Sequence, residues 1–369
     1  MAAGADGASA PCLSLDRSVH WEREKIVVGD TLGVSVTKLA LITSDDGTHI
    51  VIVIGIERHT YTDPPRAPTF EYRVCAWNVE DSRLLWQRMP KAGEILYDLF
   101  PIVLSNGARV VALALDQCSL LMMPLDEKMV SWRIDMDVRG VAHLGAFCEG
   151  ILFWSGRDAA FGCVVEAPDS ARKGLFEGHT GDVTSLDATT HKGQVLLATA
   201  SADHAVRLWN GSSNGRTFGP HPVILHDGEV TFVAFLPRAD EDEPLRALSM
   251  ATRPFVARVW SVEDRATIFK STGPYDLGTL VRHEWCTIVR RAWAPDGAIV
   301  PAALVFTTDD ELVLWRPDEG GEAITLGDCD ASCASVDCSG SLVVWLAREH
   351  GRQYIAIARP APRTKAARA

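Results

Sequence analysis

Short segments in which apolar and polar residues alternate recur along most of the chain, and turns rather than helical stretches separate them. Alternation with a period of two residues is typical of half-buried β-strands. The clearest unit runs from 177 to 210, EGHTGDVTSLDATTHKGQVLLATASADHAVRLWN. It predicts a strand, the turn HKG, a strand VLLATAS, the tight turn ADH and a strand VRLWN. We therefore expect an all-β chain built from one repeated meander.

Tryptophans mark the same position in four such units, near the end of the strand that follows the tight turn. Trp77 and Trp209 lie three repeats of about 44 residues apart, and two weaker units fill the interval. A seventh unit begins at CASVDC and lacks a fourth strand, whereas residues 18–29, SVHWEREKIVVG, belong to no unit. We expect them to supply that strand, because closure leaves a repeat ring without exposed ends. The four tryptophans are Trp77, Trp209, Trp260 and Trp315.

The unit at 177–210 resembles a repeat of the WD-repeat β-propeller family, through its Gly178–His179 opening and its SADHAVRLWN ending. The turns APDG at 294–297 and SDDG at 44–47 match that repeat's inner turn. The resemblance implies an all-β, seven-bladed β-propeller over residues 16–360, its last blade closed by an N-terminal strand, between disordered tails at 1–15 and 361–369. VCAWNVEDSRLLWQ and LLMMPLDEKMVSWR also resemble quinoprotein-type propeller repeats, an alternative for the blade family but not for the overall shape.

The WD-repeat resemblance assigns one blade a hydrogen-bonded network of His179, Thr199 (with Ser201 as the alternative), Asp203 and Trp209. A buried indole N–H needs an acceptor, and a hydroxyl and an imidazole can connect it to a carboxylate that stiffens a tight turn. The same residue types form hydrolase triads, but a catalytic nucleophile must be exposed to its substrate. Here the hydroxyl lies in an alternating strand and is expected to face inward. We interpret the set as structural and expect no enzyme.

Charge and cysteine content narrow the function classes. The chain has 36 basic and 48 acidic residues, a net charge of −12, which disfavours direct nucleic-acid binding. Its 9 cysteines are irregularly spaced, which is typical of a reducing compartment, so we expect a cytoplasmic or nuclear protein. The N-terminus lacks the features of a secretory signal, and the longest apolar run, IVIVIGI, is too short for a membrane helix. We expect no membrane partner.

No motif for a metal or a cofactor stands out. Cys329, Cys333 and Cys338 lie in DCDASCASVDC, but their spacing does not match paired zinc ligands and no fourth ligand follows at a usual distance. We interpret them as small apolar residues of the last blade. The glycine motifs that bind nucleotides are missing from the sequence. We therefore expect neither a bound metal nor a cofactor.

Loops on one face of the ring form the predicted binding region. The turn at 57–70, ERHTYTDPPRAPTF, is long, stiffened by prolines and rich in aromatic residues, as functional loops often are. Arginines recur at the equivalent turns of other blades, and arginine suits bidentate capture of carboxylate or phosphate. The candidate partner-binding residues are Arg58, Tyr61, Arg157, Arg253 and Arg352.

These observations favour a non-enzymatic scaffold or adaptor that binds protein partners, with an acidic or phosphorylated peptide as one candidate, as a subunit of a multiprotein complex. Several alternatives stay open: a non-catalytic subunit of an RNA-modifying or ubiquitin-ligase complex, a WD-repeat hydrolase, and a nucleic-acid binder that uses the arginines. Scattered, solvated arginines and a tolerated loop insertion would give the same pattern. The acidic run at 240–243 is expected on the other face, in contact with solvent.

Overall fold

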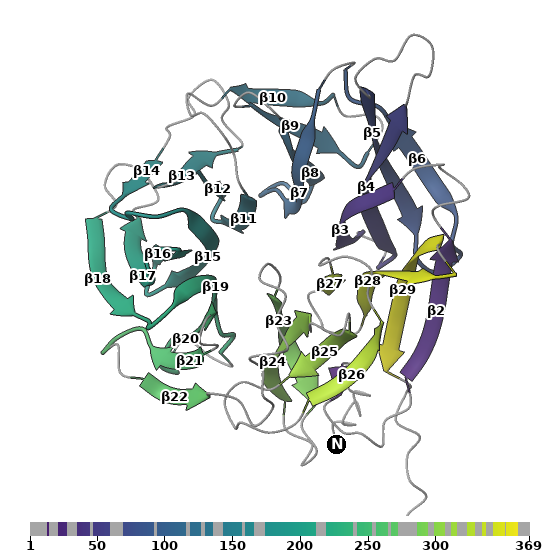
Figure 1. The fold of residues 1–369 in the computed structure, drawn as a ribbon. Coiled ribbons are helices and arrows are strands. Elements are labelled where there is room, and N and C mark those ends of the chain that lie inside the picture. The colour runs from purple at the N-terminus through teal and green to yellow at the C-terminus, as the bar shows by residue number, and fades with distance from the viewer. Residues whose placement is uncertain are drawn as a thin grey trace, which may run out of the picture.

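The computed structural model places most of the chain in short β-strands (Figure 1). None of the described segments forms a helix long and apolar enough to cross a bilayer. For some residues only the backbone is described. The residues that the structure describes are 13–14, 21–27, 35–44, 47–59, 69–91, 94–115, 119–126, 130–135, 143–156, 159–165, 174–211, 219–238, 242–252, 256–264, 267–271, 286–293, 299–306, 311–315, 323–328, 334–336, 342–350 and 352–360.

The described strands form seven sheets arranged in a ring, each with an antiparallel core of four strands and with its inner strand nearest the centre (Figure 1). This confirms the predicted all-β, seven-bladed propeller. In blades 1 to 3 each strand bonds to the next one in the chain. These strands are, in blade 1, β3 (Ser35–Thr43), β4 (His49–His59), β5 (Thr69–Asn78) and β6 (Leu84–Arg88); in blade 2, β7 (Leu96–Val103), β8 (Arg109–Leu115), β9 (Ser119–Pro124) and β10 (Trp132–Asp135); and in blade 3, β11 (His143–Cys148), β12 (Ile151–Ser155), β13 (Ala159–Val164) and β14 (Gly174–Glu177).

Blades 4 to 6 repeat this order, and blade 7 takes its first three strands from the end of the chain. The strands are, in blade 4, β15 (Val183–His191), β16 (Gln194–Ser201), β17 (Ala205–Gly211) and β18 (Gly219–Leu225); in blade 5, β19 (Glu229–Phe235), β20 (Arg246–Thr252), β21 (Val256–Ser261) and β22 (Thr267–Ser271); in blade 6, β23 (Cys286–Trp293), β24 (Ile299–Phe306), β25 (Glu311–Trp315) and β26 (Ala323–Asp328); and in blade 7, β27 (Ala334–Val336), β28 (Val343–Glu349) and β29 (Arg352–Pro360).

The four marker tryptophans all lie in the third strand of their blades, as the repeat alignment predicted. Each has at most 2% of its surface exposed. The second strands are buried on both faces, and the apolar run Val51–Ile54 in β4 is fully covered, because neighbouring blades sandwich each sheet. The described core forms seven apolar clusters, and each joins two adjacent blades. The core therefore lies between the blades, and no blade is stable alone.

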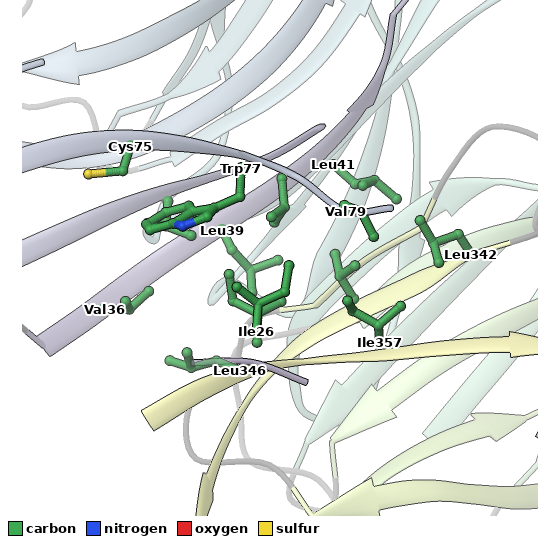
Figure 2. Packing of buried hydrophobic residues seen from close by; sticks show 14 residues of the cluster. Ile26, Val36, Leu39, Leu41, Cys75, Trp77, Val79, Leu342, Leu346 and Ile357 are labelled. Carbon is green, nitrogen blue, oxygen red and sulfur yellow. The ribbon is translucent and has the colours of Figure 1, made fainter. Parts of the chain in front are cut away.

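Strand β2 (Trp21–Val27) is the fourth strand of blade 7, which confirms that an N-terminal strand closes the ring. It runs antiparallel to β29 with Trp21 opposite Pro360, and in Figure 1 the purple β2 lies beside the yellow β29. Ile26 packs into the apolar cluster between blades 7 and 1, together with Trp77 and Ile357 (Figure 2). The two ends of the chain thus hold one another in a single sheet.

A further short strand, β1 (Leu13–Ser14), pairs in parallel with β23 of blade 6. It places Leu13 opposite Ala292, within the segment 1–15 for which the sequence suggested a disordered tail. The other residues of that segment, and the tail expected at 361–369, lie outside the described residues.

Candidate functional site

The loops of the ring fall on two faces. Because neighbouring strands of a blade are antiparallel, the turn from the second to the third strand and the link to the next blade share one face. We call this the link face; its described parts include residues 178–182, 202–204 and 226–228. The remaining turns, such as 192–193, lie on the opposite face. The polar network of blade 4 and the described candidate arginine Arg352 both belong to the link face.

A continuous chain of hydrogen bonds runs through the third and second strands of blade 4 to its link. The indole Nε1 of Trp209 donates to Thr199 Oγ1 at 2.9 Å. Thr199 Oγ1 lies 2.7 Å from Nε2 of His179. The Asp203 carboxylate can only accept, so Nδ1 of His179 carries a proton and donates to it at 2.9 Å. The relay uses Thr199 and not the alternative, Ser201.

Asp203 and Ser201 organise the tight turn after β16. Asp203 accepts the backbone N–H of Thr180 at 3.0 Å and that of Ala205 at 3.1 Å. Ser201 Oγ donates to the carbonyl of Gly181 at 2.9 Å. A Cβ at Gly181 would lie 2.9 Å from the backbone nitrogen of Asp203, so this close approach of link and turn requires glycine.

The electrostatics of the network agree with a structural role. Burial lowers the pKa of His179 below its usual value, although the Asp203 carboxylate acts in the opposite direction. Burial would raise the pKa of Asp203, but hydrogen bonds from Thr180 N–H and His179 outweigh it and hold that pKa below its usual range. The Thr199 side chain is fully buried, so its hydroxyl meets no substrate. The set therefore cannot act as a hydrolase triad.

The stability of the protein should decrease when the pH falls below about 6.5, the usual pKa of histidine. His179 binds a proton less readily in the folded state than in the unfolded chain, so acid favours unfolding. We expect urea denaturation at about pH 7.5 and about pH 5.5 to show a smaller loss in a His179→Asn variant than in the wild type. Equal losses in the two proteins would contradict this role, since the other histidines titrate in both.

Blade 5 contains a shorter version of the network. The indole Nε1 of Trp260 donates to Ser249 Oγ at 3.2 Å, and that hydroxyl lies 2.9 Å from Nε2 of His226. The sequence TRPF stands where blade 4 has its aspartate turn. Blade 5 therefore repeats the tryptophan, hydroxyl and histidine part of the network, and its turn sequence contains no aspartate.

Two arginines that the sequence analysis did not single out support the links. Arg207 and Arg258 each stand two residues before their blade's tryptophan. Arg258 donates to the carbonyl of Leu225 at 2.7 Å and lies 3.8 Å from Asp227. The Arg207 guanidinium lies 3.9 Å from Asp203. The shared Arg-x-Trp spacing was a visible signal for this pair.

Among the five candidate partner-binding residues, only Arg352 has a described side chain. It begins β29 at the link face and is exposed. Arg58 lies in β4, with its side chain outside the described residues. Tyr61, Arg157 and Arg253 lie wholly outside them. The grouping of these residues into one binding surface therefore stays a prediction.

The opposite face carries a joint between blades 4 and 5. Arg238 donates to Nδ1 of His191 at 3.0 Å, and Nε2 of His191 lies 3.2 Å from a Glu263 oxygen. Asp242 and Glu243 of the acidic run are exposed, as expected. Within the described ranges no three His, Cys, Asp or Glu side chains gather as a metal site. The cysteines at 329, 333 and 338 lie outside those ranges.

Curated proteins match parts of the sequence. The chain is 35% identical over 88 residues to the nuclear distribution protein PAC1 of Fusarium vanettenii, which covers 23% of this chain and 19% of that protein. It is 28% identical over 187 residues to coronin-7 of Bos taurus, covering 49% of this chain and 18% of that protein. The chain thus spans about a fifth of the length of these relatives. No family profile matches the sequence.

Solved structures match the ring as a whole. A chain of the mitotic checkpoint complex gives a TM-score of 0.65 at 14% identity, covering 97% of this chain and 98% of that one. The WD40 β-propeller domain of Doa1 gives a TM-score of 0.59 at 14% identity, covering 92% and 97%. At such identities the likeness shows the fold alone.

Proposed function

The chain is a WD-repeat β-propeller, and we propose that it acts as a non-enzymatic scaffold or adaptor that binds protein partners through its link face. The observation that carries the proposal is the burial of the His179, Thr199 and Asp203 set inside blade 4. The residues that most resemble catalytic machinery are occupied in holding a link and a turn in place. The solvent-exposed part of blade 4 at the link face is therefore a set of loops held in fixed positions.

Contacts between blades support this role, because they fix the loops before any partner arrives. The backbone N–H of Val36 in blade 1 donates to Gln353 Oε1 of blade 7 at 2.9 Å. Asp187 of blade 4 accepts the backbone N–H of Phe235 of blade 5 at 2.8 Å. A partner that binds such a preorganised surface meets little ordering cost on the propeller side.

The proposed ligand of the arginine-bearing turns is an acidic or phosphorylated peptide, bound in the cytoplasm or the nucleus. The exposure of Arg352 supports it, since guanidinium groups recognise carboxylate and phosphate through paired donors. A hydrolase function is disfavoured by the buried hydroxyl of Thr199. Membership in an RNA-modifying or ubiquitin-ligase complex would use the same surface.

The arginine surface is tested by affinity purification of the wild type beside a triple variant, Arg157→Glu, Arg253→Glu and Arg352→Glu. We expect the triple variant to lose at least one partner that the wild type recovers, because charge reversal repels an acidic ligand. The matched control is Arg83→Glu, an exposed change in the third-to-fourth-strand turn of blade 1, on the opposite face. It should recover the wild-type set.

Two outcomes would count against this assignment. Recovery of the same partners by the wild type and the triple variant would remove the arginines from the binding surface. Recovery of partners that falls steeply as the salt concentration rises, and that is abolished by nuclease treatment, would favour nucleic-acid binding.

A further inference from the structure

Three large apolar side chains are exposed where blade 1 joins blade 2. They lie in or beside the link between β6, the outermost strand of blade 1, and β7, the inner strand of blade 2, of which residues 89–91 and 94–95 are described (Figure 1). Met89 is 56% exposed, Ile95 37% and Tyr97 51%. The other large exposed apolar side chains among the described residues are spread over separate elements. Exposed apolar residues that gather in one segment mark interaction sites more often than single ones do.

The backbone of this link is ordered at both ends. The Glu94 N–H donates to the Lys91 carbonyl at 3.0 Å, and the Lys91 N–H donates to the Glu94 carboxylate at 2.9 Å. Glu94 also pairs with Arg133 of β10. At the inner end, buried Asp98 lies 3.8 Å from the ammonium of Lys38 in β3. These contacts hold the chain on either side of Ile95 and Tyr97.

Tyr97 is the exposed residue at a bulge in β7. The pairing with β8 shifts between Leu96 and Asp98, so Tyr97 has no opposite residue. The inner strands of four other blades show the same shift at the same place. Bulges re-aim side chains and are frequent beside functional sites. The residues at the other four bulges are small: Thr37, Gly145, Thr184 and Thr231.

The charged side chains around the link indicate the charge of a partner that would bind there. Both described carboxylates of the segment 88–98, Glu94 and Asp98, lie beside basic side chains. Arg88 stands over the ring of Trp86, 5.1 Å from its centroid, and Lys91 is exposed. Among the described residues neither cation has a carboxylate partner. The surface is therefore apolar and positive on a chain whose net charge is −12.

We propose that Met89, Ile95 and Tyr97 form a docking stripe for a short extended segment of a partner protein. That segment places apolar or aromatic residues on the stripe and acidic residues against Arg88 and Lys91. The link crosses the width of a four-stranded blade, roughly 14 Å, which an extended peptide covers in about four or five residues. The inference rests on the proposed function, because it names the partner chemistry for the same face.

A phage-displayed library of random dodecapeptides, selected on the full chain, is the probe. We expect enriched peptides that combine apolar or aromatic residues with Asp or Glu. By fluorescence anisotropy, synthetic copies should bind an Ile95→Ser/Tyr97→Ser variant about tenfold or more weakly than the wild type, and Lys91→Glu should also lower the affinity of these peptides.

These side chains are exposed, so the variants should have the same melting temperature as the wild type. The matched control is Val130→Ser, which is 85% exposed on the opposite face and should bind like the wild type.

Three results would overturn the stripe: no enrichment of such peptides, unchanged affinity in the double variant, or an oligonucleotide that binds through Lys91 while the double variant binds it normally. The first two leave the scaffold function intact if the arginine variants still alter the recovered partners. If those partners are also unaffected, the proposed function fails separately.

Discussion

Replacing Trp209 with alanine should lower the free energy of unfolding by about 4 kcal/mol. The side chain is 1% exposed and meets Phe176 edge to face, with 5.7 Å between ring centroids. It fills the interface between blades 3 and 4, so its removal leaves a cavity that two sheets line. The loss also deprives Thr199 of its donor. Equilibrium denaturation in guanidinium chloride, followed by circular dichroism, measures the change.

A Trp209→Phe variant separates packing from hydrogen bonding. Phenylalanine keeps most of the aromatic contact but donates nothing to Thr199, so we expect a loss of about 2 kcal/mol. The matched control is Trp86→Phe in the outer strand of blade 1, where the indole is only partly buried. That change should cost less than about 1 kcal/mol. Equal losses at the two positions would show that the network contributes nothing beyond packing.

The blades were predictable because their signal is repeated. Strand alternation, a tryptophan at a fixed place and turn residues at fixed offsets recur around the chain, so weak units are recognised from their neighbours. The closing strand followed by elimination, since residues 18–29 fitted no unit and one blade lacked a strand. The network of His179, Asp203 and Trp209 in blade 4 was implied by the resemblance of residues 177–210 to a WD repeat, which left Thr199 and Ser201 open as the hydroxyl.

Contacts between distant segments were not predictable from local pattern. In LYDLFPIV, residue type alone would favour burial of the aromatic Tyr97 and exposure of the charged Asp98, whereas the structure exposes Tyr97 and buries Asp98 together with the next residue, Leu99. The bulge after Leu96 shifts the register by one residue, which turns each following side chain to the other face. Asp98 tolerates burial because Lys38 approaches from the neighbouring blade. The docking stripe depends on an exposed aromatic side chain beside a buried carboxylate, so sequence reasoning could not find it.

Removing residues 1–27 should abolish the cooperative folding transition. Without β2, blade 7 loses its outer strand, and the edge of β29 is left open to pair with other chains. The apolar cluster between blades 7 and 1 loses Ile26, so we expect the ring to open at this joint. We expect aggregates in size-exclusion chromatography and a broad thermal transition in place of a sharp one.

A circular permutant tests whether the loss comes from pairing rather than from chain length. Because Trp21 lies opposite Pro360, a short glycine-rich turn can join residue 360 to residues 21–27 in a chain that begins at residue 35. That chain should regain a sharp transition, because β2 then forms a hairpin with β29. Within the natural order, Ile26→Ala should cost about 3 kcal/mol, and Glu24→Ala, at an exposed position of the same strand, less than about 0.5 kcal/mol. If the truncated chain folds as well as the permutant, the pairing of β2 with β29 is not needed to close the ring.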